Sequence, residues 1–290
     1  MTSALRKAIP QVVTSALRED VRSGDITSMF LVPADSTSKV RIICRHSGVI
    51  AGLPVAREVF QQTDSRVVFR CRVRDGECVK NNTVIAEVRG RTRSLLSAER
   101  TALNFLQRMS GIATRTKEFA DKIHGTGANV LDTRKTCPGL RYLDKYAVCC
   151  GGGVNHRIGL FDQVLIKENH LSALIEEGVE RPVAEAVVRA RKKAGKKVKI
   201  EIEVEHITEL KQALEADPDI ILLDNMSLAQ MKQAVQIRNS MNSTVLLEAS
   251  GNVTLRRIAS IARTGVERIS VGELTHSVKA LDITMLWKNS

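Results

Sequence analysis

The sequence is poor in aromatic residues, which make up only 3% of its 290 residues. Bases of single-stranded nucleic acid stack on aromatic side chains, so this scarcity argues against a single-strand-binding surface. Long apolar runs are also missing, because stretches such as residues 220–223 fall far short of the ~20 residues that a membrane-spanning helix needs. We therefore expect a soluble protein with neither a nucleic acid nor a membrane as its partner.

The six cysteines lack the C-x-x-C spacing of a zinc site. Cys149 and Cys150 are direct neighbours, a separation at which a disulfide rarely has good geometry. We expect reduced thiols and hence a cytoplasmic location. The first residues contain no acid before Glu19, which superficially suits a transit peptide, but their apolar residues recur at helical spacing and favour a structural helix.

Acidic residues are outnumbered, 32 against 44 basic ones, which gives a net charge of +12. Such a chain attracts anions, either nucleic acid or small phosphate compounds. The longest basic run, around residues 191–199, falls where a helix is predicted to end, and cations are favourable there. A solvated helix end is therefore the preferred interpretation, and a basic RNA-binding barrel remains the alternative that is not an enzyme.

The first 110 residues have the pattern of an α+β domain. β-branched segments predict strands, apolar periodicity predicts helices, and turn signals such as Asp75-Gly76 separate them. The predicted strands are 39–44, 67–73 and 83–88, and the predicted helices after the first one are 54–62 and 93–109. Short connections favour an antiparallel sheet, and Ser110-Gly111 is predicted to end the long helix.

From about residue 128, short apolar strands alternate with helices, which is typical of βα units and a parallel sheet. The predicted strands are 129–131, 163–166, 198–204, 220–223, 244–247 and 268–271, with helices at 182–194, 207–216, 228–238 and 255–263. Polar residues follow every strand. A doubly wound sheet would concentrate them at one switch point, whereas a barrel gathers all its strand ends at one mouth. We therefore predict an α/β fold with an incomplete barrel of about six or seven strands.

Four cations follow the predicted strands, namely Arg134, Lys135, Arg157 and Lys167, with His156 beside them. Like charges at one mouth repel each other unless an anion lies between them. Salt bridges could serve some of these cations, but the acids nearby are too few for all four. Because arginine suits planar, bidentate recognition of carboxylates, the pattern predicts a ligand that carries carboxylates.

Two acids at neighbouring strand ends, Glu203 and Asp224, predict a Mg²⁺ site. Magnesium usually takes one or two carboxylates together with substrate phosphate and water. Asp224 is the stronger indication of a metal site, because it directly follows an apolar strand. The alternative for Glu203 is that Glu201, Glu203 and Glu205 form one alternating polar face of a strand.

Two glycine-containing turns, Ser250-Gly251-Asn252 and Val271-Gly272, are predicted to lead into helices near residues 254 and 275. Unpaired N–H groups at a helix start bind phosphate, and glycine allows close approach of the backbone. In α/β barrels a phosphate commonly sits in the loops after the last two strands. The combined site suits a phosphorylated sugar that meets a carboxylic acid.

The motifs at these positions resemble those of the quinolinate phosphoribosyltransferase family. They are Asp132-Thr133-Arg134-Lys135-Thr136, Lys145-Tyr146-Ala147-Val148, Cys150-Gly151-Gly152-Gly153, Asn155-His156-Arg157, Leu165-Ile166-Lys167-Glu168-Asn169-His170, Glu99-Arg100-Thr101-Ala102-Leu103-Asn104, Leu223-Asp224-Asn225, Glu248-Ala249-Ser250-Gly251-Asn252 and Val271-Gly272-Glu273-Leu274-Thr275-His276. The resemblance implies an N-terminal α/β sandwich domain (1–110), a barrel domain (111–275) and a tail (276–290) that returns to the first domain. It also implies a Mg²⁺-dependent, decarboxylating phosphoribosyltransferase of NAD biosynthesis, with quinolinate and phosphoribosyl pyrophosphate as substrates.

The resemblance further implies roles for individual residues. The quinolinate carboxylates would be held by Arg100, Arg134, His156, Arg157 and Lys167. The catalytic set would be Lys135, Glu203 and Asp224, of which the two acids also bind the metal and the ribose. Phosphoribosyl pyrophosphate would be bound by Ser250, Gly251, Gly272 and His276.

The resemblance implies a homodimer, or a higher even-numbered oligomer, in which Arg100 completes the neighbouring site. Two other enzyme families are alternatives. Nicotinate phosphoribosyltransferase acts on a substrate without the second carboxylate and would need fewer cations, and a molybdenum-transport-associated relative shares the fold and some motifs. The set Arg134-Lys135 with Asn155-His156-Arg157 favours quinolinate.

Overall fold

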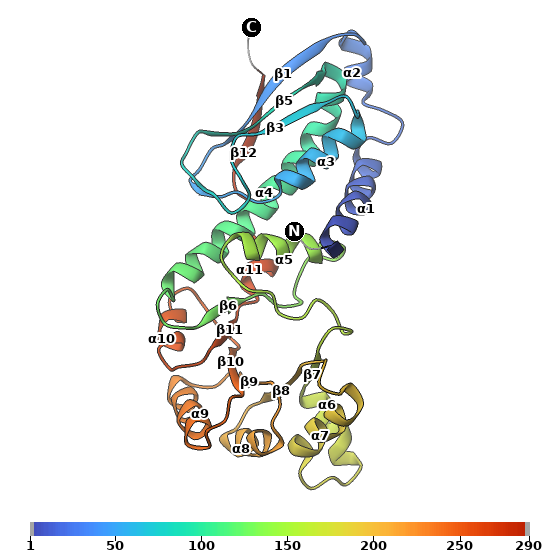
Figure 1. Ribbon diagram of the computed structural model, residues 1–290. Coiled ribbons are helices and arrows are strands. Elements are labelled where there is room, and N and C mark those ends of the chain that lie inside the picture. Colours follow the sequence, from blue (N-terminus) through green and yellow to red (C-terminus); the bar gives the residue numbers. More distant parts are fainter. Residues whose placement is uncertain (1–2, 288–290) are drawn as a thin grey trace. The chain divides into compact units, whose positions relative to one another are not determined.

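The structure, a computed structural model, describes residues 3–287 of the chain. These residues form two compact units (Figure 1). The first contains the chain up to residue 117, residues 135–153 and the segment from residue 274, and the second contains residues 118–134 and 154–273. The chain therefore leaves the first unit after residue 117 and returns to it twice.

The first unit contains a four-stranded antiparallel sheet in the order β12-β1-β5-β3. Its strands are β1 (Thr37–Cys44), β3 (Val68–Cys71), β5 (Thr83–Arg91) and β12 (Ile283–Trp287), and a small second sheet joins β2 (Gly48–Val49) to β4 (Cys78–Val79). In β1, Val40, Ile42 and Cys44 are buried, which is the alternation of a strand with one face on the core. The C-terminal strand β12 pairs antiparallel with β1, so the end of the chain completes this sheet.

The helices of this unit pack on the sheet and on each other. They are α1 (Ser3–Asp20), α2 (Ile26–Leu31), α3 (Leu53–Thr63), most of α4 (Thr92–Lys122), α5 (Arg141–Cys150) and most of α11 (Glu273–His276). Helix α1 buries Leu5, Ile9 and Val13, the apolar face predicted from the sequence. The structure therefore contains a folded helix where a transit peptide was the other interpretation.

Helix α4 is longer than predicted, because Ser110 and Gly111 lie inside it and do not end it. The Ser110 hydroxyl accepts the main-chain N–H of Ala51 at 3.0 Å. A Cβ atom on Gly111 would lie 2.3 Å from the carbonyl oxygen of Lys279. The predicted helix end is wrong because these small residues admit two neighbouring backbone segments against the helix, a tertiary requirement that local sequence does not reveal.

Segment 135–153 lies in the first unit, although the predicted barrel domain of 111–275 includes it. Side chains of α5 explain this placement. The Tyr146 hydroxyl donates to Asp75 at 2.8 Å, and Asp75 also accepts the main-chain N–H groups of Gly52 and Leu53 at the start of α3. One half-buried carboxylate therefore joins α5 to α3.

The second unit contains a six-stranded parallel sheet in the order β6-β11-β10-β9-β8-β7. Its strands are β6 (Asn129–Leu131), β7 (Val164–Ile166), β8 (Ile200–Val204), β9 (Ile220–Asp224), β10 (Leu246–Ser250) and β11 (Arg268–Ser270), and its helices are α6 (Glu168–Glu176), α7 (Pro182–Ala194), α8 (Ile207–Ala216), α9 (Leu228–Ser240) and α10 (Ile258–Ala262). All six predicted strands are confirmed. Residues 220–223 are fully buried, as expected where helices cover a parallel sheet.

Strands β6 and β7 stand at opposite ends of this strand order, so hydrogen bonds do not close the sheet into a full ring. A single parallel bridge between Leu131 and Val154 extends it beyond β6. This arrangement is the predicted incomplete barrel. Among the described helices, none is both long and apolar enough to cross a membrane.

Candidate active site

The polar residues predicted at the strand ends lie along one edge of the parallel sheet. Asp224 and Ser250 are the last residues of β9 and β10 and are partners in register. Glu203 is the penultimate residue of β8, Lys167 follows β7 directly, and Gly272 follows shortly after β11. Because the strands are parallel, these residues share the carboxyl edge, where α/β barrels carry their active sites.

Arg134 and Arg157 carry hydrogen-bond donors that the described part of the chain does not satisfy. The Nε atoms of both side chains are buried there without a hydrogen-bond partner. Arg157 is only 9% exposed, and its Nη1 atom donates to the main-chain oxygen of Gln163 at 3.2 Å. Burial lowers the pKa of Arg157, and the positive charge of Arg134 lowers it further. Two like charges with buried, unpartnered Nε donors suit a planar anion such as a carboxylate.

Lys167 and Glu203 form an ion pair between β7 and β8. The Lys167 side chain is half exposed, whereas that of Glu203 is largely buried. The sequence assigned the lysine to a carboxylate ligand and the glutamate to a metal, and the structure brings the two together. An anion bound to Lys167 and a cation bound to Glu203 would each replace one partner of this pair.

His156 lies buried between two glutamates. Its Nε2 atom is 3.0 Å from a carboxylate oxygen of Glu201 and 3.4 Å from one of Glu248. Burial opposes protonation, but hydrogen bonds to Glu201 and Glu248 outweigh it and raise the pKa of His156 to about 9. The main-chain N–H of Arg157 donates to Nδ1 at 2.7 Å, so the neutral form of the ring, present above that pKa, keeps its proton on Nε2, facing the carboxylates.

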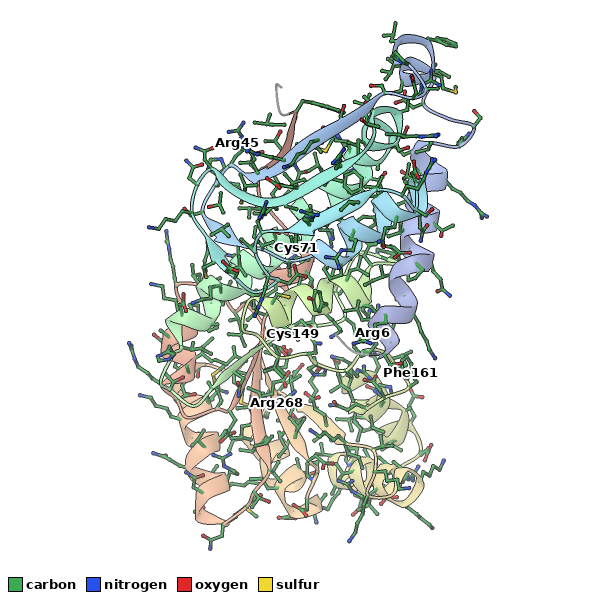
Figure 2. All side chains as sticks on the ribbon, turned by 45° about the horizontal axis from the view of Figure 1, so that its top comes forward. Arg6, Arg45, Cys71, Cys149, Phe161 and Arg268 are labelled. Carbon is green, nitrogen blue, oxygen red and sulfur yellow. The ribbon has the colours of Figure 1, made fainter. Side chains whose placement is uncertain are left out.

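The two glutamates belong to a buried polar network inside the second unit. Glu248 pairs with Arg268 at 2.6 Å and accepts the Ser270 hydroxyl, while Glu201 accepts Gln163 Nε2 at 2.5 Å; Figure 2 labels Arg268. Burial and the charge of Glu248 raise the pKa of Glu201. The pKa of Glu248 is lowered: burial opposes ionisation, but the bond from His156 and the charge of Arg268 outweigh it. The network therefore holds its shared proton between Glu201 and the imidazole.

His156, Glu201 and Glu248 offer donor atoms within 4.8 Å of one another, a spacing that could hold a metal ion. Their existing bonds argue against that use. Glu248 is already paired with Arg268, and the Nε2 atom of His156 carries the proton that faces the carboxylates. These three residues are therefore better explained as a hydrogen-bonded supporting network than as metal ligands.

The loops after β9 and β10 are joined through Asn225. Its side-chain amide donates to Asp224 Oδ2 at 2.7 Å, and its main-chain N–H donates to the carbonyl of Ser250 at 3.0 Å. Asp224 and the Ser250-Gly251 turn are therefore held together, as the sequence placed them.

The predicted helix start near residue 254 is wrong, whereas the one predicted near residue 275 is confirmed two residues earlier. A turn follows Gly251, in which the carbonyl of Thr254 accepts the N–H groups of Arg257 and Ile258, and α10 begins only at Ile258. Helix α11 begins at Glu273, directly after Gly272, and spans four residues. The Gly251 turn therefore presents its backbone without an adjoining helix start.

Three of the predicted site residues, Arg100, Lys135 and His276, belong to the first unit. Arg100 is exposed on α4. The Thr275 hydroxyl donates to the carbonyl of Lys135 at 2.8 Å, so Lys135 and the neighbour of His276 lie side by side. Arg108 supports this arrangement by donating to the carbonyl of Thr275.

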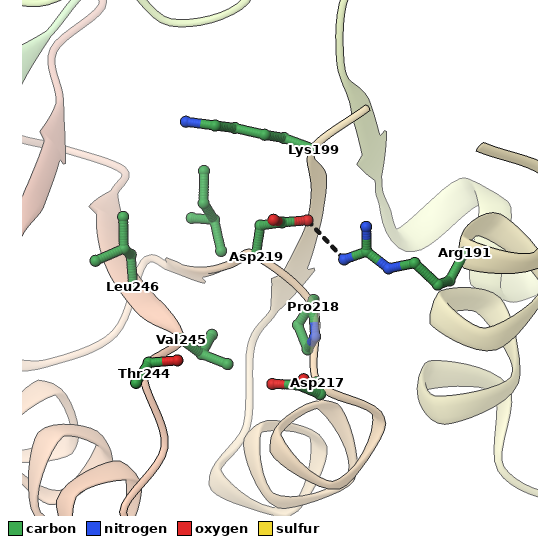
Figure 3. A pocket seen from close by; sticks show the side chains of 9 residues that line it. Arg191, Lys199, Asp217, Pro218, Asp219, Thr244, Val245 and Leu246 are labelled. Atoms are coloured by element: carbon green, nitrogen blue, oxygen red, sulfur yellow. Dashed lines mark hydrogen bonds and ion pairs between the residues drawn. The ribbon is translucent and has the colours of Figure 1, made fainter. Parts of the chain in front are cut away.

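A cavity of about 410 Å³ lies at the other edge of the parallel sheet, where β9 and β10 begin (Figure 3). Arg191 and Asp219, which line it, form an ion pair at 2.6 Å. Asp219 also accepts the main-chain N–H of Ile200. Arg191 and Asp219 satisfy each other here, whereas the carboxyl edge carries the buried, unpartnered Nε donors of Arg134 and Arg157, so that edge remains the candidate site.

Comparison with known proteins shows the family of the chain. The family described as "Quinolinate phosphoribosyl transferase, N-terminal domain" matches residues 25–110, and the one described as "Quinolinate phosphoribosyl transferase, C-terminal domain" matches residues 112–286. The chain belongs to the quinolinate phosphoribosyltransferase family. Within this family, a carboxylating nicotinate-nucleotide pyrophosphorylase from Mycobacterium leprae is 44% identical over 95% of this chain and 96% of its own length.

A mitochondrial decarboxylating quinolinate phosphoribosyltransferase from Nicotiana tabacum is 41% identical over 94% of this chain and 80% of its own length. Among solved structures, the nicotinate-nucleotide pyrophosphorylase from Francisella tularensis has a TM-score of 0.89 and 40% identity, covering 97% of this chain and 96% of its own. A human nicotinic acid phosphoribosyltransferase has a TM-score of 0.61 at 12% identity and shares the fold alone, over 96% of this chain and 73% of its own.

Sequence reasoning missed the buried network of this quinolinate phosphoribosyltransferase family member. The sequence pattern places Glu201 only on a polar strand face and predicts no role for Glu248 or Arg268. The sequence does contain a signal for this network. Helices cover the outer face of a parallel sheet, so a polar residue that alternates along a strand faces the barrel interior. Branched apolar residues are usual in that interior, so a glutamate there indicates a buried polar network. Glu201 and Glu248 are both fully buried there.

Proposed function

We propose that this protein transfers the phosphoribosyl group of phosphoribosyl pyrophosphate to quinolinate, releasing pyrophosphate and carbon dioxide and forming nicotinate mononucleotide for NAD biosynthesis. The observation that carries the proposal is the pair Arg134 and Arg157, whose buried Nε donors lack partners in the described chain. A substrate with two adjacent carboxylates supplies the missing acceptors and charge. Membership of the quinolinate phosphoribosyltransferase family supports the same substrate.

Quinolinate binding uses Arg134, Arg157 and Lys167 in this proposal, with His156 as their buried support, because both of its ring nitrogens already have partners. The two arginines pair with the carboxylates through charge-assisted hydrogen bonds. His156 stays rigid because Glu201 and Glu248 hold its imidazole. Lys167 exchanges Glu203 for the ligand. The substrate is thereby oriented with its ring nitrogen toward the ribose.

Phosphoribosyl pyrophosphate binding uses Ser250, Gly251, Gly272 and His276 for its phosphates and Lys135 beside both substrates. The short turn at Gly251 exposes main-chain N–H groups, and glycine allows phosphate to approach them closely. Gly272 precedes α11 directly. The net charge of +12 favours such an anionic ligand.

Glu203 and Asp224 suit Mg²⁺, because both offer carboxylate oxygens, the ligands that this cation prefers. Asp224 accepts Asn225 through Oδ2 and keeps Oδ1 without a partner in the described chain. When bound, Mg²⁺ supplies positive charge that neutralises the departing pyrophosphate. The carboxylates also stabilise the positive charge that develops at the ribose carbon as the leaving group departs.

Attack by the pyridine nitrogen on that carbon makes the nitrogen quaternary. Carbon dioxide then leaves, the electron pair of the broken carbon–carboxylate bond stays on the ring carbon next to the positive nitrogen, which stabilises it, and that carbon takes up a proton from water. Arg134 and Arg157 hold the carboxylates in place until that step.

We also propose a homodimer in which Arg100 completes the site of the neighbouring subunit. Phe30 and Leu31 of α2 are 80% and 77% exposed, and Leu160 and Phe161 are 73% and 77% exposed, which supports their burial by another chain. An equal mixture of Arg100→Ala and Asp224→Asn subunits should regain roughly a quarter of wild-type activity, because about half of the dimers are mixed and each mixed dimer contains one intact site of two. If mixed dimers form and activity stays at the level of the single variants, Arg100 acts in its own chain or not at all.

We place the protein in the cytoplasm because all six cysteines are free in the structure, as a reducing compartment keeps them. The Nicotiana tabacum relative is named mitochondrial, so location varies within the family. Fractionation of cells that express the native protein checks this assignment, and recovery of the protein in an organelle would contradict it.

The test of the proposed reaction compares quinolinate with nicotinate as acceptor, in the presence of phosphoribosyl pyrophosphate and Mg²⁺. Nicotinate should be a very poor substrate, because it leaves part of the buried cation site unpaired. Similar kcat/KM for the two acids would favour a nicotinate phosphoribosyltransferase. Salt-sensitive RNA binding without any turnover would favour a basic RNA-binding barrel.

A further inference from the structure

We propose that Asn225 is a positioning residue that holds Asp224 and the Gly251 turn in the arrangement needed by phosphoribosyl pyrophosphate. The inference rests on the proposed function, which assigns Asp224 to the metal and ribose and Ser250-Gly251 to phosphate. Asn225 itself has no assigned role in that account. It lies between the ends of β9 and β10 and contacts both loops.

Three hydrogen bonds carry the inference. The Nδ2 atom of Asn225 donates to Asp224 Oδ2 at 2.7 Å, and Oδ1 of the same amide accepts Asn252 Nδ2 at 3.2 Å. The main-chain N–H of Asn225 donates to the carbonyl of Ser250 at 3.0 Å. One residue therefore fixes the carboxylate of one loop against the backbone and side chain of the other.

The space above Gly251 is occupied by the same amide. A Cβ atom on Gly251 would lie 2.1 Å from Asn225 Oδ1 and 2.6 Å from its Cγ, and Gly251 also has a φ of +89°. Glycine at this position thus serves the Asn225 amide as well as the approach of a phosphate. Any larger residue would push the amide away from Asp224.

The backbone of Asn225 supports a role for its side chain. Its φ is +52°, in the left-handed region that glycine adopts at lower cost than any other residue. Asparagine tolerates this region better than most side chains, but it gains nothing over glycine from the turn alone. The hydrogen bonds of the side-chain amide therefore explain why this position carries asparagine and not glycine.

The bridge sets how Asp224 presents its carboxylate. Donation by the amide fixes Oδ2 and leaves Oδ1 without a partner in the described chain. Without the amide, the carboxylate could rotate and the Gly251 turn could separate from β9. Ribose and phosphates belong to one ligand, so Asp224 and the Gly251 turn must keep a fixed relative position to bind it.

The decisive variant is Asn225→Gly, which keeps the left-handed turn and removes only the amide. Asn242→Gly is its matched control, because Asn242 is also exposed with a φ of +51° but lies after α9, away from the carboxyl edge. Calorimetry measures the Kd of phosphoribosyl pyrophosphate with Mg²⁺ and, separately, the Kd of quinolinate. Thermal unfolding of both variants checks the fold.

We expect Asn225→Gly to bind phosphoribosyl pyrophosphate at least about tenfold more weakly than the wild type, the order of effect for a lost hydrogen bond to a charged group. Its quinolinate affinity and melting temperature should match those of Asn242→Gly. Wild-type affinity for phosphoribosyl pyrophosphate in folded Asn225→Gly would overturn the inference and leave the turn as the only role of Asn225.

A second variant covers the case in which Asn225→Gly does not fold. Asn225→Asp tolerates the same φ and keeps an acceptor for Asn252, but it loses the donor to Asp224. It should show the same selective loss, and unchanged binding would overturn the inference. A wild-type protein that binds no phosphoribosyl pyrophosphate would instead overturn the proposed function itself.

Discussion

Replacing Arg134 with Met should stabilise the protein in the absence of ligand. The Arg134 guanidinium makes no hydrogen bond or ion pair within the described chain, and its Nε atom is buried. An unsatisfied buried donor costs about 1–3 kcal/mol. Methionine has similar length and adapts to irregular space, and a neutral side chain also removes the repulsion that Arg157 experiences. We expect a gain of about 1–3 kcal/mol in the free energy of unfolding.

The same substitution should remove the protection that quinolinate gives. A ligand at ~1,000 times its Kd stabilises the folded protein by about 4.1 kcal/mol. The wild type should gain that amount. Arg134→Met should gain little, because it lacks the guanidinium that pairs with a quinolinate carboxylate. The order of stability of the two proteins therefore reverses when quinolinate is added.

Thermal unfolding with and without quinolinate measures both effects, at about 2–4 °C for each kcal/mol. Arg263→Met is the control, because it removes the same charge from an exposed position after α10. A less stable Arg134→Met protein that quinolinate still protects as it does the wild type would refute the reasoning.

Three further predictions follow from single contacts. Arg157→Lys keeps the charge but loses the planar guanidinium, so quinolinate affinity by calorimetry should fall about tenfold while affinity for phosphoribosyl pyrophosphate holds; unchanged quinolinate binding would remove Arg157 from the site. The pKa of His156, raised to about 9, lies above its ordinary value of about 6.5. The contribution of His156 to the free energy of unfolding is therefore complete below about pH 6.5 and is lost as pH rises through about 9. Urea titrations should show a loss of up to about 3 kcal/mol over this range, and His156→Gln should flatten the pH dependence. Gly111→Ala should lower the melting temperature, although Ala favours a helix by about 1 kcal/mol, because its Cβ meets the carbonyl of Lys279; a higher melting temperature would contradict the packing.

The parallel strands could be predicted because each is a short apolar run bounded by turns and helices. Residues 220–223, buried throughout, are the clearest case. The position of the polar site residues could be predicted from the same pattern, because the residues that follow parallel strands lie along one edge of the sheet. Asp224 and Ser250, predicted from separate segments, are indeed partners in register.

The rest depended on contacts between distant segments. The alternation of Glu201 and Glu203 looks the same for a strand facing solvent and one facing a barrel interior, and only the covering helices decide between them. The role of Gly111 depends on Lys279, which lies far along the chain. Asn225 reads as an ordinary turn residue until Gly251 and Asn252 are placed beside it.

The central claim, a decarboxylating transfer of phosphoribose to quinolinate, is tested most directly by product stoichiometry. Quinolinate labelled in the carboxylate beside the ring nitrogen is incubated with the pure protein, phosphoribosyl pyrophosphate and Mg²⁺. The account predicts labelled carbon dioxide, nicotinate mononucleotide and pyrophosphate in equal amounts, and none of them with Asp224→Asn. Absence of nicotinate mononucleotide, or its formation without release of the label, would contradict the account.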